Sequence, residues 1–145
     1  ILRLCGARVA GSTKIRPSVK IDKPWNLEAG HLAIFGDDAV LVLDETLKVG
    51  DRCVVSQYAL VLTSCIEPDQ PAGVPDAGRR RRGAITIEDD CWVAADALVM
   101  PGSAVRAGTV VGARSMVDGE VAGWSVAVGE PARAIKPRGF VNTGG

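Results

Sequence analysis

The chain has 145 residues, which is within the usual range for a single domain that buries a real core. Lys and Arg number 17 and Asp and Glu number 17, so the formal net charge is zero and gives no support for a nucleic-acid or polyanion partner. No apolar run is long enough to cross a bilayer, and no signal peptide is visible. The first residue is Ile1 rather than Met, which favours a fragment or a trimmed chain.

The cysteines and the single histidine give no indication of a metal site. None of the four cysteines stands in a CxxC pair, and His31 is the only histidine of the chain. We therefore expect no zinc or other metal. The cysteines are best explained as small apolar packing residues in a reducing cytosol, so we expect a cytoplasmic protein.

An apolar residue recurs at every sixth position from the start of the chain. The first run comprises Val9, Ile15, Ile21 and Leu27. The frame slips between Leu27 and Val49, near Asp44 and Glu45. It resumes with Val49, Val55 and Val61. Four positions after these lie Cys53, Ala59 and Cys65, at the position of the repeat where we expect a small residue. Across residues 64–84 the periodicity vanishes, which predicts a loop ejected from the repeat.

The repeat is unbroken in the second half of the chain. Its β-branched members are Ile87, Val93, Val99, Val105, Val111 and Val117. Four positions after each lie Cys91, Ala97, Ser103, Thr109, Ser115 and Val121. Neither a helix nor a simple alternating strand keeps this period. A prism-shaped coil does, because each hexad supplies one short strand and one corner, with the β-branched residue pointing to the axis.

Five segments go beyond the generic repeat. They are IRPSVKIDKPWNLEAG (Ile15–Gly30), VVSQYALVLTS (Val54–Ser64), IEDDCWVAADALVMPG (Ile87–Gly102), VVGARSMV (Val110–Val117) and GWSVAVGEPARAIKPR (Gly123–Arg138). Together they resemble the WcaF-type acetyltransferases of colanic acid biosynthesis, which belong to the hexapeptide-repeat O-acetyltransferases. The resemblance covers nearly the whole chain, and ILRLCGARV (Ile1–Val9) resembles the end of the helical segment that precedes the repeat in this family.

The resemblance implies an all-β fold, a single-stranded left-handed parallel β-helix with one ejected loop and a C-terminal tail. We expect one domain over residues 1–145, with the loop at about 64–84 and the tail at about 123–145. The resemblance also implies a homotrimer that binds acetyl-CoA in the groove between neighbouring subunits. The activity that it implies is O-acetyl transfer to a hydroxyl of a sugar or glycan precursor.

The residues expected at the catalytic position depart from the family pattern. Family members carry Thr-Gly-Ser-His-Asp after SQYA, and the matching stretch here is Thr63-Ser64-Cys65-Ile66-Glu67. The acceptor hydroxyl needs a general base, and Ile66 at the histidine position cannot accept a proton. Glu67 is the candidate substitute base, and the alternative is that it is a solvated loop carboxylate.

The resemblance assigns further site residues. Asp44, beside Glu45, resembles an acidic pair that binds acceptor hydroxyls. Contacts to acetyl-CoA are implied for Trp92, Ala94, Ala95, Gly112 and Ala113, and charge-assisted bonds to its phosphates for Arg133, Lys136 and Arg138. Plain repeat packing explains the small residues equally well. Asp118-Gly119 replaces a family Thr-Lys pair, which removes one cation.

Two features admit more than one interpretation. His31 is expected to be a surface corner residue, and it could reach a site only through a neighbouring subunit or an unexpected register. The basic run Arg79–Arg82 in the loop is expected to be solvated, and the alternative is a clamp for a CoA phosphate or an anionic glycan.

Ile66 leaves a second class of function open, a catalytically impaired relative that binds CoA or glycan, or serves as a trimeric scaffold. A carbonic anhydrase of the same solenoid type needs three histidine ligands, and the single His31 excludes it.

Overall fold

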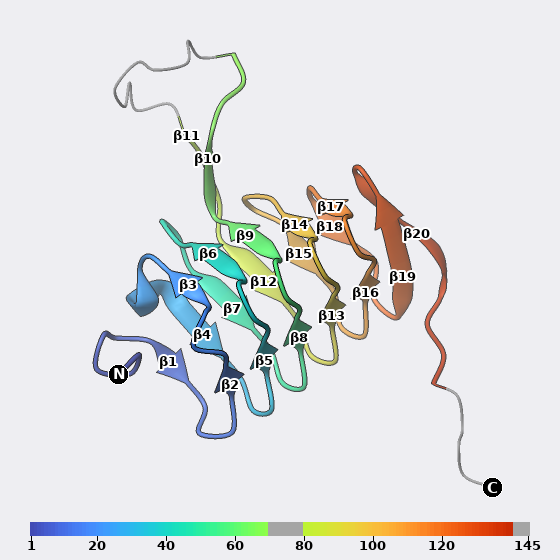
Figure 1. The fold of residues 1–145 in the computed structure, drawn as a ribbon. Coiled ribbons are helices and arrows are strands. Elements are labelled where there is room, and N and C mark those ends of the chain that lie inside the picture. Colours follow the sequence, from blue (N-terminus) through green and yellow to red (C-terminus); the bar gives the residue numbers. More distant parts are fainter. Residues whose placement is uncertain (70–79, 141–145) are drawn as a thin grey trace, which may run out of the picture.

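The structure is a computed structural model that describes residues 1–69 and 80–140. Its strands stack into three parallel sheets that form the sides of a triangular prism (Figure 1). Sheet A contains β1 (Arg8–Val9), β4 (Leu27–Ala29), β7 (Leu47–Val49), β12 (Ile85–Ile87), β15 (Ala104–Val105) and β18 (Glu120–Val121). The predicted all-β, left-handed parallel β-helix is confirmed.

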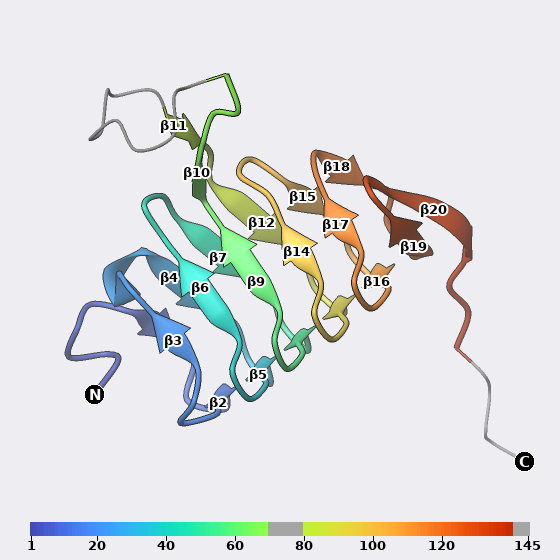
Figure 2. The ribbon, with the colours of Figure 1, turned by 45° about the horizontal axis from the view of Figure 1, so that its top comes forward.

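The other two sides of the prism are built in the same way. Sheet B contains β2 (Lys14–Ile15), β5 (Ile34–Phe35), β8 (Val54–Val55), β13 (Trp92–Val93), β16 (Val110–Val111), β19 (Ser125–Gly129) and the antiparallel β20 (Ala132–Pro137). Sheet C, which faces the reader in Figure 2, contains β3 (Lys20–Ile21), β6 (Val40–Val42), β9 (Leu60–Leu62), β14 (Leu98–Val99) and β17 (Met116–Val117).

The core is the axis of the prism. The β-branched residues predicted to point inward from Ile87 to Val117 are all 0 or 1% exposed. Each stacks on its counterpart in the coils above and below, for example Val93 between Val55 and Val111 in sheet B. Phe35 is the largest side chain that is fully buried there. Stiff side chains in register therefore form a continuous dry core along the axis.

The corners of the prism are named here by the sheets they join. The A/B corner comprises residues 10–13, 30–33, 50–53, 88–91, 106–109 and 122–124, and the B/C corner comprises residues 16–19, 36–39, 56–59, 94–97 and 112–115. Among the described residues, the C/A corner comprises 22–26, 43–46, 63–69, 80–84, 100–103 and 118–119, and it holds the insertions.

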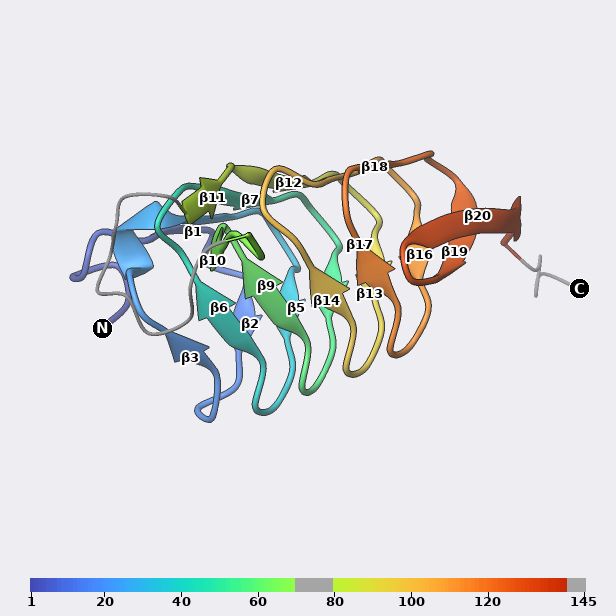
Figure 3. The same cartoon turned by 90° about the horizontal axis from the view of Figure 1, so that it is seen from above.

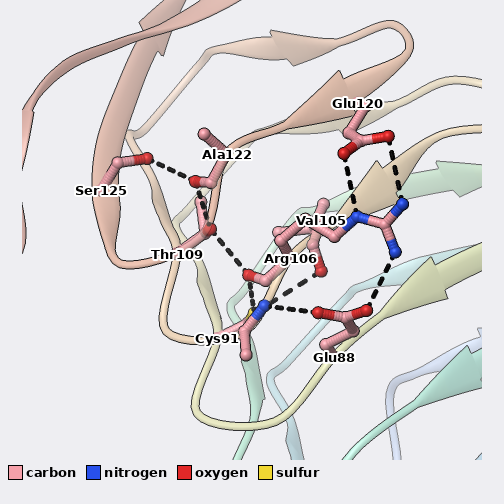
Figure 4. Close-up of polar contacts among 9 residues, drawn as sticks. Glu88, Cys91, Val105, Arg106, Thr109, Glu120, Ala122 and Ser125 are labelled. Carbon is pink, nitrogen blue, oxygen red and sulfur yellow. Dashed lines mark hydrogen bonds and ion pairs between the residues drawn. The ribbon is translucent and has the colours of Figure 1, made fainter.

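Small polar side chains inside the A/B corner donate hydrogen bonds to main-chain carbonyls of the next coil. Cys91 Sγ donates to the carbonyl of Arg106 at 3.1 Å, and Thr109 Oγ1 donates to the carbonyl of Ala122 at 3.0 Å (Figure 4). On the outer face, the Arg106 guanidinium bridges Glu88 and Glu120 (Figure 4). The small residue of the repeat thus both fits the corner and satisfies a buried acceptor.

Three sequence assignments within the repeat are wrong by a slip of register. Val9 pairs with Ala29 rather than Leu27, although Leu27 is also fully buried. The first turn, which contains the short helix η1 (Pro24–Asn26), takes 20 residues, as does the second, whereas the coil from Ile87 to Val105 takes 18. Val121 pairs with Val105, so it is a strand residue and not a small corner residue. Cys65 lies on the ejected hairpin. In each case the extra or missing residues lie at the C/A corner.

Both ends of the solenoid differ from a plain coil. Residues 2–6 form successive turns before β1 rather than a helix. At the other end, the β19–β20 hairpin extends sheet B beyond the last coil (Figure 3). The ejected segment leaves the solenoid as β10 (Ser64–Ile66) and returns as β11 (Arg80–Arg82), paired antiparallel.

Candidate active site

The hairpin at the C/A corner carries the residues at the family's catalytic position. In β10, Ile66 pairs with Arg80 and is 63% exposed, and the half-buried Glu67 follows it directly. Strand β10 projects from the solenoid beside β9 and β12 (Figures 1 and 2). Glu67 therefore directly follows, along the chain, the position where the family has histidine.

Asp44 lies at the base of this hairpin in a network of donors. Its Oδ1 accepts a hydrogen bond from Lys23 Nζ, and its Oδ2 accepts one from Ser64 Oγ. Arg80 Nη1 lies 3.7 Å from Oδ2. The bonds from Lys23 and Ser64 lower the pKa of Asp44 to about 2, so its carboxyl group is ionised at neutral pH.

Asp44→Asn is expected to lower the free energy of unfolding by about 2 kcal/mol at pH 7. The folded-state pKa of Asp44 is below its unfolded value, so its stabilisation is present above pH 4 and is lost as the pH falls toward 2. Urea unfolding at pH 7 and pH 2 measures this, and the two proteins should become alike at pH 2. Asp37→Asn, which removes an exposed ion pair with Arg16, should cost under about 0.5 kcal/mol. An equal deficit of the Asp44 variant at both pH values would contradict the assignment.

Two residues of the arginine run contact different carboxylates of the solenoid. Arg80 lies beside Asp44, whereas Arg81 Nη2 donates to Asp118 Oδ1. Arg82 is exposed and pairs with Ser64 in the hairpin. Arg79 lies outside the described residues. Arg80 and Arg81 are thus parts of ion pairs, and the expectation that the run is solvated is wrong for these two residues.

The residues assigned to acetyl-CoA gather on the outside of sheet B and at the adjoining B/C corner. Trp92 lies on the outer face of β13 and is 47% exposed, and its Nε1 donates to Ser56 Oγ at 2.9 Å. Ala94 and Ala95 occupy the next positions at the corner, and Gly112 and Ala113 occupy the same place one coil later. Ala94 is buried, Ala95 and Gly112 are partly exposed and Ala113 is exposed. The corner therefore presents a strip of small residues beside one large aromatic ring, with Ala94 beneath it.

The outer face of sheet B continues this strip toward the C-terminus. Trp92 pairs in register with Val110, Val110 with Val126, and Val126 with Lys136 of β20. Three strand spacings of about 4.8 Å each separate Trp92 from Lys136, so the two residues lie about 14 Å apart. Arg133 pairs with Val128 and is exposed on the same face. Cations thus lie at the end of an apolar strip.

Arg138 and His31 lie apart from that strip, at the A/B corner. Arg138 Nη1 donates to the carbonyls of Asp90 at 2.6 Å and Gly108 at 3.0 Å, and its guanidinium stands 5.1 Å from the Phe140 ring centroid. His31 is exposed, with its Nδ1 at 3.3 Å from Ser12 Oγ. The structure therefore brings together all the assigned acetyl-CoA residues except Arg138.

Sequence reasoning missed Ser56 and Lys23. Ser56 orients the Trp92 indole, and Lys23 neutralises Asp44 across 21 positions of the chain. Both stand inside segments that carry the family resemblance, SQYA and DKPW, but only the register of the coils shows what they contact.

No group of three or more metal-binding side chains occurs in residues 1–69 and 80–140. Over the same ranges, no helix has the length and apolar character needed to span a membrane.

No protein-family model matches the chain. The colanic acid biosynthesis acetyltransferase WcaF of Escherichia coli (strain K12) is 37% identical over 138 residues, which covers 95% of this chain and 73% of that protein. A chloramphenicol acetyltransferase of Morganella morganii is 37% identical over 59 residues, 41% of this chain and 28% of that protein.

Solved structures of low sequence identity share the fold. A maltose O-acetyltransferase from Clostridium difficile 630 superimposes with a TM-score of 0.83 at 23% identity, covering 96% of this chain and 73% of that one. The hexapeptide-repeat acetyltransferase VCA0836 of Vibrio cholerae O1 biovar eltor, complexed with acetyl-CoA, gives 0.85 at 20% identity, with 96% and 75% coverage.

Proposed function

Because the chain belongs to the WcaF family of hexapeptide-repeat acetyltransferases, we propose that it transfers an acetyl group from acetyl-CoA to a hydroxyl of a sugar or glycan precursor. The relative in Escherichia coli is named for colanic acid biosynthesis, and the Vibrio cholerae structure holds acetyl-CoA. The first supports this class of acceptor for the present chain, and the second supports this donor.

The observation that carries the proposal is the strip along the B/C corner and sheet B. Its small residues allow a flexible carrier to approach the main chain closely, and Trp92 offers an apolar wall. Lys136 and Arg133 at its far end suit the phosphates of CoA. An elongated molecule with an apolar arm and an anionic end fits this arrangement.

The reaction requires a proton to leave the acceptor hydroxyl. In the proposed step the hydroxyl oxygen bonds to the thioester carbonyl carbon, the carbon–sulfur bond breaks, and CoA leaves as the thiol. Glu67 accepts the hydroxyl proton and returns a proton to the leaving sulfur. Ile66, which is exposed beside it, offers no group for either transfer.

Asp44 is proposed to bind an acceptor hydroxyl through its carboxylate. Its side chain keeps 14% of its surface exposed, and a carboxylate accepts more hydrogen bonds than the two from Lys23 and Ser64. Because its pKa is about 2, Asp44 would serve as an acceptor of hydrogen bonds and not as the general base.

A homotrimer is proposed on the basis of two apolar outer faces. The outer residues of sheet B in register are Ile34, Val54, Trp92, Val110 and Val126, and those of sheet C are Val40, Leu60, Leu98 and Met116. Sheet A instead exposes charged residues such as Glu28, Lys48 and Glu120. Two unlike apolar faces suit head-to-tail packing of identical chains into a closed ring. A solution mass of one chain would contradict this assembly.

The same proposal places the protein in the cytoplasm. Its four cysteines, all of them free, suit a reducing compartment, which is also where acetyl-CoA is available.

Ala113→Trp is expected to weaken acetyl-CoA binding at least tenfold, because a bulky side chain at the exposed B/C corner would occupy the strip. Isothermal titration with acetyl-CoA measures the affinity, and a thiol-release assay with a panel of p-nitrophenyl glycosides measures transfer. Ala104→Trp, on the outer face of sheet A, is the matched control and should leave binding unchanged. Binding by the unmodified protein without thiol release would indicate the impaired relative, and no binding would indicate a scaffold.

A further inference from the structure

The β10–β11 hairpin contacts the solenoid on two sides through the alternating side chains of β11. Successive side chains of a strand point to opposite faces, so Arg81 points away from the face of Arg80 and Arg82. Arg80 lies beside Asp44, in the coil before the hairpin. Arg81 reaches the coils after it, where its Nη2 donates to the carbonyl of Pro101 at 3.1 Å and to the carboxylate of Asp118.

Asp118 has no other ion-pair partner among residues 1–69 and 80–140. The pair lowers the pKa of Asp118 and raises that of Arg81, and their side chains are 35% and 37% exposed. Asp118 is also a departure from the family pattern, because Asp118-Gly119 replaces a Thr-Lys pair and adds an anion. The charge introduced at 118 is therefore matched by a cation from a segment 37 positions earlier in the chain.

The stem of the hairpin is packed closely against the next coil. Gly83 N donates to the carbonyl of Thr63 at 2.9 Å, and Gly102 N donates to the carbonyl of Gly83 at 3.1 Å. A Cβ atom on Gly83 would lie 2.7 Å from Gly102 Cα. The main chain of residue 83 is thus held in place, and the next anchor along the hairpin is Arg81.

We infer that the ion pair between Arg81 and Asp118 locks the hairpin against the C/A corner and thereby positions Cys65–Glu67 for the acceptor. This rests on the proposed function. Arg81 stands opposite Cys65 in the hairpin register, so holding Arg81 in place also holds the main chain of the residues that lead to Glu67. A two-stranded hairpin is marginally stable in water on its own, so contacts with the solenoid decide how often this one is formed. Arg81 and Asp118 are positioning residues.

Hydrogen exchange tests the lock without reference to activity. In Asp118→Asn, the amides of residues 64–66 and 80–82 are expected to exchange about fivefold faster, as measured by mass spectrometry of the full chain. The amides of sheets A, B and C should keep their rates. The double variant Arg81→Asp with Asp118→Arg restores the pair with its charges exchanged, and it should recover most of the protection. Unchanged exchange in the single variant, or no recovery in the double variant, would overturn the lock.

Kinetics then test whether the lock positions the acceptor site. With acetyl-CoA and p-nitrophenyl glycosides, Asp118→Asn should lower kcat/KM for the glycoside about fivefold and leave the Kd for acetyl-CoA unchanged, and the double variant should recover the rate. A loss of acetyl-CoA affinity equal to the loss of kcat/KM would overturn the positioning role. If the unmodified chain transfers no acetyl group, the proposed function fails while the exchange result still decides the lock.

Discussion

Ile66→His is expected to raise the rate of acetyl transfer about 100-fold. General-base assistance contributes about two to four orders of magnitude, and the lower end applies here because Glu67 already offers a carboxylate beside this position. Ile66 is 63% exposed on the hairpin, so an imidazole at this position meets no packing conflict. The thiol-release assay gives the rate at saturating acetyl-CoA, and its pH profile should gain a step near pH 6.5, where histidine titrates.

Two variants separate a gain of a base from a general effect of the substitution. Ile66→Gln places a polar side chain at the same point without a proton acceptor of suitable pKa, and it should leave the rate within about twofold. Glu67→Gln should abolish most of the activity of the unmodified chain, and it should matter little once histidine is present. An unchanged rate in the histidine variant would mean that the missing base does not limit this chain.

The repeat made the fold predictable in its regular parts. From Ile87 to Val117 each β-branched residue was assigned to the core from its spacing, and each is buried there. The register errors at Leu27 and Val121 have a common cause, because a count of six residues does not hold across the C/A corner. The strand residue comes two positions later than the count at Ala29 and two positions earlier at Val121. Strand register is decided by pairing with the neighbouring coil, which a local count does not contain.

The candidate site was predicted from the family resemblance and not from the period. The structure brings Trp92, Gly112 and Lys136 together, because each lies on the outer side of sheet B or at its edge. The partner of Asp118 was not predictable, because Arg81 belongs to an insertion that follows no period. The resemblance marked Asp118-Gly119 as a pair that loses a cation and gains an anion, and the structure pairs Asp118 with a cation from the hairpin.

Phe35→Ala is expected to cost about 3 to 5 kcal/mol of unfolding free energy, the largest effect on stability predicted for this chain. Phe35 is fully buried in sheet B, between Ile15 and Val55 in register, and the flanking corner residues Ala33 and Ala39 are too small to fill the space it would leave. Urea unfolding measures the change.

Because each coil of a solenoid contacts only its neighbours, the cavity at Phe35 acts at one place along the axis. It should uncouple the first coil, so hydrogen exchange should rise in β1 to β3 before it rises in β14 to β17. Phe35→Leu keeps most of the volume and should cost under about 1.5 kcal/mol, with no such gradient. A uniform loss of protection along the whole axis in Phe35→Ala would mean that the coils unfold as one unit and that stacking between neighbours does not limit their coupling.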